Sequence, residues 1–141
     1  MERSKADFKA LREIVGMSQQ VLADALQVDK RSIQRWEAPT NEWRPPADAW
    51  EVLDAAREQQ RWTVANALEV VRSTENLHAS VELTYWKSQE EYERAGHGGD
   101  YQMANANVRI IAAILEQEGR AVSFGFGGLR AAGIEADYNG M

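Results

Sequence analysis

The chain of 141 residues contains no cysteine, which excludes disulfide bonds, thiol nucleophiles and thiolate metal sites. Only two histidines are present, His78 and His97, which is too few for most metal sites. No apolar run approaches the roughly 18 residues that a membrane-spanning helix needs. The first residues lead directly into amphipathic sequence, without the apolar segment of a signal peptide. We therefore expect a cytoplasmic protein that has no membrane contact, metal or cofactor.

The charge balance separates two parts of the chain. The net charge of −6 argues against nucleic-acid binding, because a nucleic-acid binder is expected to present a basic face. Residues 1–46, however, carry eight Lys and Arg against seven Asp and Glu, whereas residues 47–141 carry eight against fifteen. The acidity therefore belongs to the second part, and the first part remains compatible with a nucleic-acid partner.

Prolines are also scarce, and all three lie within residues 39–46, which predicts a loop between helical segments. Three short helices are expected before this loop: residues 6–15, ended by Gly16; residues 18–26, begun by Ser18; and residues 29–37, begun by Asp29. Apolar spacing predicts the inward-facing residues of these helices, which are Phe8, Leu11, Val15, Val21, Leu22, Ala25, Ile33 and Trp36.

After the loop, residues 47–72 are expected to form one long helix or two helices. A polar break over 73–79 precedes an alternating segment, 81–86, which predicts a strand that pairs with a second strand over 121–126. Between them we expect a short helix over 88–93, capped by Ser88, and a longer helix over 101–118, with residues 127–141 loosely organised. Since two strands alone are marginal in water, this small α+β module needs helix packing or a second subunit.

The most specific signal is a set of spacings within residues 6–38. The residues that share these spacings are Leu11-Arg12, Gly16-Met17-Ser18-Gln19, Leu22-Ala23, Val28, Ser32-Ile33 and Trp36-Glu37. This set resembles the XRE/Cro family of helix-turn-helix regulators, the class of the lambdoid phage repressors. Gln27 stands where this family usually has glycine, so the turn requires a strained or left-handed residue that is not glycine.

The third helix is expected to bury one face and to offer the other to DNA. An α-helix fits the major groove of DNA, where arginine can make two hydrogen bonds to guanine and glutamine two to adenine. Arg31 and Arg35 are four residues apart and are therefore neighbours on the helix surface. The resemblance implies that the base-reading residues are Lys30, Arg31, Gln34 and Arg35.

The resemblance also implies contacts with the DNA backbone and one structural ion pair. Gln19 matches a phosphate-contacting position at a helix N-terminus, which favours an anion. Arg12 and Glu37 match an ion pair between the first and third helices. The expected phosphate contacts are Ser18, Gln19, Ser32, Thr40, Asn41 and Arg44.

A second resemblance lies in the acidic part of the chain, and the residues that carry it are Tyr85-Trp86, Gly98-Gly99-Asp100-Tyr101, Arg109 and Leu115. This part is similar to the C-terminal dimerisation part of anti-CRISPR-associated (Aca) regulators and of YdiL-type bacterial proteins. The resemblance implies a homodimer on an inverted repeat, with recognition helices about 34 Å apart in successive major grooves.

Together these patterns predict a mainly α fold. A lambda-repressor-like helix-turn-helix bundle forms a DNA-binding domain over residues 1–75, and a two-stranded α+β dimerisation module follows over residues 76–141. The expected function is sequence-specific transcription regulation on double-stranded DNA, as a homodimeric autorepressor and not as an enzyme. Two alternatives remain: an antitoxin whose second half binds a toxin, and a small enzyme or ligand sensor.

Overall fold

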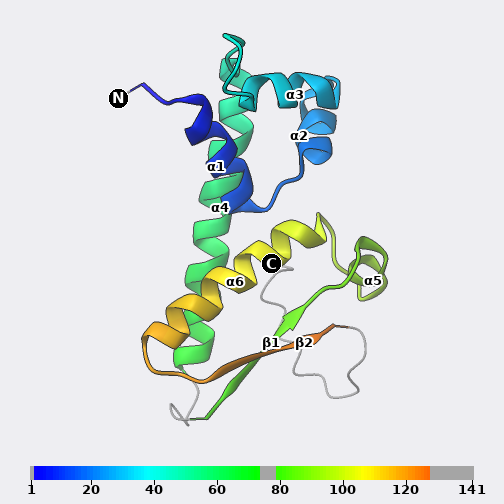
Figure 1. The fold of residues 1–141 in the computed structure, drawn as a ribbon. Helices are drawn as coiled ribbons and strands as arrows, with labels where there is room; N and C mark the ends of the chain where they lie inside the picture. Colours follow the sequence, from blue (N-terminus) through cyan, green and yellow to red (C-terminus); the bar gives the residue numbers. More distant parts are fainter. Residues whose placement is uncertain (1, 74–78, 128–141) are drawn as a thin grey trace. The chain divides into compact units, whose positions relative to one another are not determined.

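The computed structural model describes residues 2–73 and 79–127, and this part of the chain is mainly helical with one small sheet (Figure 1). The chain forms two compact units that divide between Gln59 and Gln60. Residues 128–141 of the expected loose segment and residues 74–78 of the polar break, which include His78, lie outside the described residues. The elements are α1 (Lys5–Val15), α2 (Gln19–Leu26), α3 (Lys30–Glu37), α4 (Ala47–Arg72), β1 (Val81–Tyr85), α5 (Gln89–Arg94), α6 (Tyr101–Gln117) and β2 (Val122–Phe126).

Local capping explains where the first two helices begin and end. The Ser4 hydroxyl accepts the Asp7 backbone N–H at 3.0 Å, and the Asp7 carboxylate accepts the Ser4 N–H at 2.7 Å, which forms a capping box. Gly16 ends α1 in the left-handed conformation, with φ of 77°. The predicted cap at Ser18 is confirmed, because its hydroxyl accepts the Val21 N–H at 3.0 Å.

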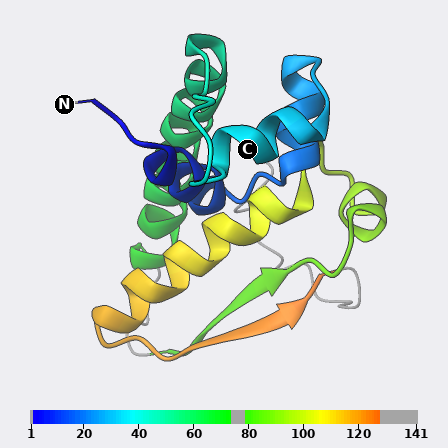
Figure 2. The same cartoon turned by 45° about the horizontal axis from the view of Figure 1, so that its top comes forward.

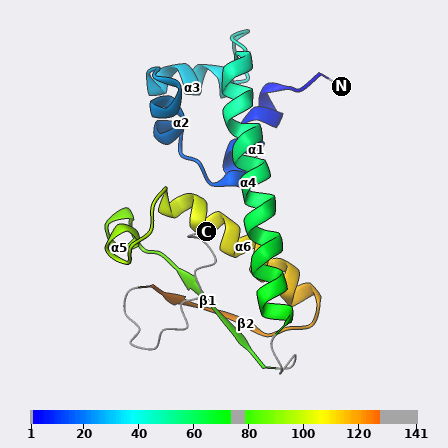
Figure 3. The same ribbon diagram turned by 180° about the vertical axis from the view of Figure 1, so that it is seen from behind.

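A short turn joins α2 to α3, and the two helices lie side by side (Figure 3). Gln27 ends α2 in the left-handed conformation, with φ of 57° and ψ of 44°. The prediction of a left-handed residue that is not glycine at this position is therefore confirmed. Asp29 occupies the N-cap position of α3 as predicted, but its side chain makes no capping hydrogen bond.

The buried side chains of the first unit come from α1, α2, α3 and the first turns of α4. The prediction that Ala25 faces inward is wrong, because Ala25 is exposed. The buried residues of the eight-residue helix α2 are Leu22 and Ala23, and Val21 is half-buried. Trp36 is also half-buried, with its ring edge-on to the ring of Phe8 at 6.3 Å between centroids. The buried apolar residues of these helices are Phe8, Val15, Leu22, Ala23, Ile33, Ala49 and Leu53, and Met17 is buried in the segment between α1 and α2.

The segment after the proline-containing loop forms a single helix, α4, which settles the choice between one helix and two. The Pro46 carbonyl accepts the N–H groups of Ala49 and Trp50, so the helix begins directly after the last proline. None of the helices in the described ranges combines the length and apolar character that a membrane crossing requires.

The second unit contains the two strands, whose predicted pairing is confirmed. They run parallel, with Val81 opposite Val122 and Tyr85 opposite Phe126, and Figure 2 shows both arrows pointing the same way. Parallel neighbours need a long crossover connection, which α5 and α6 supply here. Ser88 caps α5 as predicted, by accepting the Glu91 N–H at 3.1 Å.

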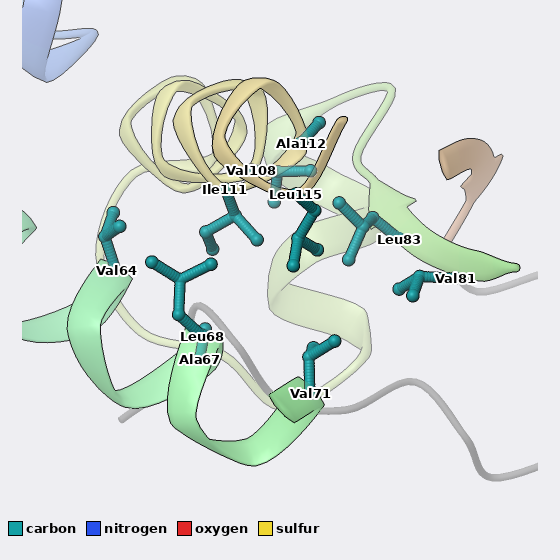
Figure 4. Packing of buried hydrophobic residues seen from close by; sticks show 10 residues of the cluster. All are labelled: Val64, Ala67, Leu68, Val71, Val81, Leu83, Val108, Ile111, Ala112 and Leu115. Carbon is teal, nitrogen blue, oxygen red and sulfur yellow. The ribbon is translucent and has the colours of Figure 1, made fainter. Parts of the chain in front are cut away.

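The main core of the second unit lies between α6, β1 and the last turns of α4 (Figure 4). The apolar side chains that recur at helical spacing on α6 are buried, namely Val108, Ile111, Ala112 and Leu115. Burying such side chains contributes about 25 cal/mol per Å² of apolar surface removed from water, so this cluster is the main stabilising term of the unit. Its members are Val64, Ala67, Leu68, Val71, Val81, Leu83, Val108, Ile111, Ala112 and Leu115.

A second cluster surrounds Trp86, which follows β1. Its indole packs edge-on against Tyr92 at 5.4 Å, and His97 stacks on the same tyrosine at 4.8 Å. The Asn105 side chain accepts the backbone N–H of Trp86 and donates to its carbonyl, both at 2.8 Å. This buried amide therefore satisfies the backbone at the end of β1, where Gly127 also packs directly against the indole.

We expect Gly127→Ala to lower the free energy of unfolding by about 1–3 kcal/mol, the usual cost of overpacking a core. A methyl group at position 127 would lie 2.5 Å from Cζ3 of Trp86 and 2.7 Å from Cγ2 of Thr84. Gly98→Ala is the matched control, because nothing lies within 4 Å of the added methyl group. Urea unfolding followed by circular dichroism measures both variants, and equal stabilities would contradict this packing.

Candidate nucleic-acid interface

The third helix, α3, has one buried and one exposed face. Ile33 is fully buried, and Glu37, one turn later, is 8% exposed. The helical repeat of 3.6 residues places the intervening polar side chains on the opposite face. The four expected base-reading residues all lie on that exposed face, which gathers Lys30, Arg31, Gln34 and Arg35.

The cationic side chains of this face have no carboxylate partner among the residues that the structure describes. Over residues 2–73 and 79–127, no carboxylate lies within ion-pair distance of Lys30, Arg31 or Arg35. Arg72 and Arg94, in contrast, pair with Glu118 and with Glu90 and Glu91. Unpaired surface cations retain their full attraction for an external anion, so α3 presents positive charge to a ligand.

A buried ion pair holds α3 against α1. Arg12 and Glu37 are each 8% exposed, and the guanidinium donates to both carboxylate oxygens, from Nε at 2.5 Å and from Nη2 at 2.9 Å. The remaining Nη1 group donates to the carbonyl of Met17 at 2.9 Å. This two-point geometry fixes both side chains, so the pair sets where the last turn of α3 lies relative to α1.

The beginning of α2 is tied to the same carboxylate. Gln19 is half-buried, and its amide nitrogen Nε2 donates to Oε1 of Glu37 at 3.1 Å. The hydroxyl of Ser18 is occupied by its capping bond to the Val21 N–H. These two expected phosphate-contacting side chains therefore make internal bonds here. The N-terminus of an α-helix such as α2 favours an anion through its peptide groups.

The loop after α3 carries the other expected phosphate contacts. Thr40 and Arg44 are exposed, and the Arg44 guanidinium lies 4.0 Å from the carboxylate of Glu2. Asn41 is half-buried, and its side-chain oxygen accepts the Trp43 N–H at 2.8 Å. Ser32 lies within α3 and is half-buried. These residues and the exposed face of α3 all belong to the first unit.

Two residues of this surface were not predicted from the sequence, Lys5 and Trp43. The Lys5 ammonium donates to the Arg35 carbonyl at 3.0 Å and to the Asn41 carbonyl and side-chain oxygen at 3.1 and 2.8 Å. No spacing rule relates the start of α1 to the loop after α3, so only the fold reveals this contact. Trp43 carried a usable signal, because a large aromatic residue stands alone in a polar, proline-containing loop.

Arg3, just before α1, is paired with a carboxylate, whereas Arg31 and Arg35 on α3 have no carboxylate partner in the described ranges. Hydrogen bonds to the Asp54 carboxylate raise the pKa of Arg3, whose guanidinium also lies 3.8 Å from the Trp50 ring centroid. Hydrogen bonds from Ser4 lower the pKa of Asp7. Within the described ranges, no three acidic or histidine side chains are grouped to hold a metal ion. The arrangement therefore offers directed hydrogen-bond donors and positive charge.

We expect Arg12→Met and Glu37→Met each to lower the free energy of unfolding by about 3–5 kcal/mol, because each leaves an uncompensated buried charge. The double variant should lose clearly less than the sum of the two single losses. Arg3→Met, which breaks the exposed pair with Asp54, is the control and should cost much less. Urea unfolding measures all four proteins, and additive losses for the double variant would contradict the coupling.

The exposed face of α3, its ion-pair anchor and the adjoining loop make up the candidate site. No protein-family model and no curated protein matches this chain.

Proposed function

We propose that this protein is a sequence-specific DNA-binding transcriptional regulator of the XRE/Cro type. In this proposal α2, the turn at Gln27 and α3 form a helix-turn-helix, and α3 is the recognition helix. One observation carries the proposal: α3 exposes four polar side chains opposite a buried face, and its three cations have no carboxylate partner in the described part of the chain.

The chemistry of that face matches the edges of base pairs. Arg31 and Arg35 lie one helical turn apart, so they can address neighbouring base pairs in one major groove. Each guanidinium can donate two hydrogen bonds to guanine, and the Gln34 amide can bond to adenine at two points. Lys30, at the first turn of α3, completes the proposed base-reading set.

Contacts with the DNA backbone are proposed for residues that flank this face. The N-terminus of α2 offers its peptide N–H groups to a phosphate, with Ser18 and Gln19 beside it. Ser32, Thr40 and Asn41 are proposed to add hydrogen bonds, and Arg44 adds charge from the loop. Such contacts fix the register of a protein on DNA, whereas base contacts determine which sequence it prefers.

We further propose that the protein acts as a homodimer on an inverted repeat. In the second unit, β2 exposes Phe124 by 51% and Phe126 by 53%, on a sheet that has two strands within residues 79–127. The α4 segment of this unit exposes Trp62 and Val70, each by 53%, eight residues apart on one side of the helix. Large exposed apolar side chains favour a protein partner, and a second copy would present two recognition helices to DNA.

Regulation in this proposal needs no chemistry by the protein, because a bound dimer occludes a promoter. The exposed apolar side chains of the second unit also fit an antitoxin that holds a toxin there. A homodimer doubles the mass of the purified protein, whereas a toxin adds its mass only when it is bound. Mass measurements therefore distinguish the two proposals.

We expect Arg31→Ala to weaken binding to a duplex selected from a random library by about 1–3 kcal/mol and to relax base preference at one position. Binding to an unselected duplex should change much less. Fluorescence anisotropy measures both affinities. Arg44→Ala should instead weaken binding to both duplexes. It should also lower by about 1 the slope of log affinity against log salt concentration, as loss of a phosphate contact does.

Lys87→Ala is the matched charge control, because Lys87 is exposed, belongs to the second unit and has no proposed role on DNA. Equal weakening of both duplexes by Arg31→Ala would contradict its base-reading role.

Light scattering at micromolar concentration should give about twice the chain mass of 15.9 kDa. Phe124→Glu together with Phe126→Glu should shift the protein toward a monomer, because burying carboxylates in an interface is unfavourable. Lys87→Glu is the exposed control. A monomeric mass with and without the selected duplex would contradict the homodimer.

A further inference from the structure

We infer that Trp43 is a positioning residue that holds the guanidinium of Arg35 ready for base recognition. This inference deepens the proposed function and rests on it. It concerns the loop after α3, to which the expected DNA contacts assign only Thr40, Asn41 and Arg44.

The first step is the contact itself. The guanidinium carbon of Arg35 lies 5.4 Å from the centroid of the Trp43 ring. An arginine within about 6 Å of a tryptophan ring centroid is attracted by the electron-rich ring face. Because no carboxylate in the described ranges pairs with Arg35, the indole does not compete with an internal ion pair for this guanidinium.

The second step is the set of hydrogen bonds that holds the backbone of Trp43 in place. The side-chain oxygen of Asn41 accepts both the Trp43 N–H and the Lys5 ammonium, each at 2.8 Å. The same ammonium also donates to the backbone carbonyls of Asn41 and Arg35. One lysine therefore fixes both the loop that carries Trp43 and the helix turn that carries Arg35.

The third step is that the Arg35 carbonyl needs such a donor. It is one of the last four carbonyls of α3, which have no partner within the helix. A cationic donor at a helix C-terminus is favourable both as a hydrogen bond and toward the helix dipole. These contacts of the Lys5 ammonium, which we call the Lys5 brace, therefore belong to the folded unit and do not depend on DNA.

The consequence concerns the freedom of the arginine side chain. A long flexible side chain loses rotamer freedom when it binds a base, and a pre-oriented one loses less. Trp43 is 59% exposed, so it contributes little to the core and remains beside the guanidinium at the surface. Arg31 has no ring contact in the described ranges, so the effect of Trp43 should be confined to the base that Arg35 contacts.

The test uses the full chain and a duplex selected from a random library by the wild-type protein. Trp43→Ala should weaken binding to this duplex by about 2–5-fold, the range expected for an exposed cation–π contact. It should relax preference at the same base position as Arg35→Ala. Trp43→Phe should retain most of the affinity, and Arg35→Ala/Trp43→Ala should bind like Arg35→Ala alone. Ile14→Ala, which removes another exposed apolar side chain of the first unit and has no proposed role on DNA, is the control.

A second measurement needs no DNA. The Arg35 Nε–Hε signal in an NMR spectrum of the free protein should move when Trp43 becomes alanine, because the ring current is lost. An unmoved signal overturns the inference, and so does a double variant whose losses add.

The two proposals fail in different ways. If Arg35→Ala weakens selected binding and Trp43→Ala does not, the positioning role is wrong and the proposed function stands. If the library yields no enriched sequence, the proposed function itself is wrong, and the inference that rests on it falls too.

Discussion

The buried ion pair between Arg12 and Glu37 is the contact on which the arrangement of α1, α2 and α3 depends. Its guanidinium binds the carboxylate at two points, and the same carboxylate accepts the Gln19 amide from the start of α2. The ion pair therefore joins three helices. Apolar side chains in its place could pack together, but they would lack the directional hydrogen bonds that fix the orientation of the helices. Because Glu37 ends α3, fixing it also fixes the exposed face of that helix.

The distribution of charge along the chain gives a physical basis for separate roles of residues 1–46, which contain α1 to α3, and the residues that follow. The acidic excess lies in residues 47–141, whereas residues 1–46 are close to neutral. In the first unit, Glu37 forms an ion pair with Arg12, and the carboxylate of Asp7 accepts a hydrogen bond in the capping box of α1. The exposed face of α3 is therefore more basic than the local count of charges suggests. A protein with this balance should bind arbitrary DNA weakly and should depend on a few directed arginine contacts.

Much of the fold was predictable, because helical spacing, caps and strand alternation are local. The positions of Ser18, Gly16, Ser88 and the two strands follow from such signals, and the left-handed Gln27 follows from the family resemblance. The direction of strand pairing was not predictable, since it depends on how α6 packs. The exposure of Ala25 was missed because helical spacing does not show which apolar side chains of α2 pack against its neighbours: Leu22 and Ala23 are buried, whereas Ala25 is exposed. At the candidate site, residues within α3 could be read from the sequence, whereas the Lys5 brace joins segments that only the fold brings together.

The central claim is that the first unit reads DNA sequence through the exposed face of α3. Backbone NMR spectra of the full chain, recorded while a selected duplex is added, test it most directly. The account predicts that signals of residues 30–35 and of the N-terminus of α2 move most, and that they move far less with an unselected duplex. Changes confined to residues 60–127, or equal changes with both duplexes, would contradict it.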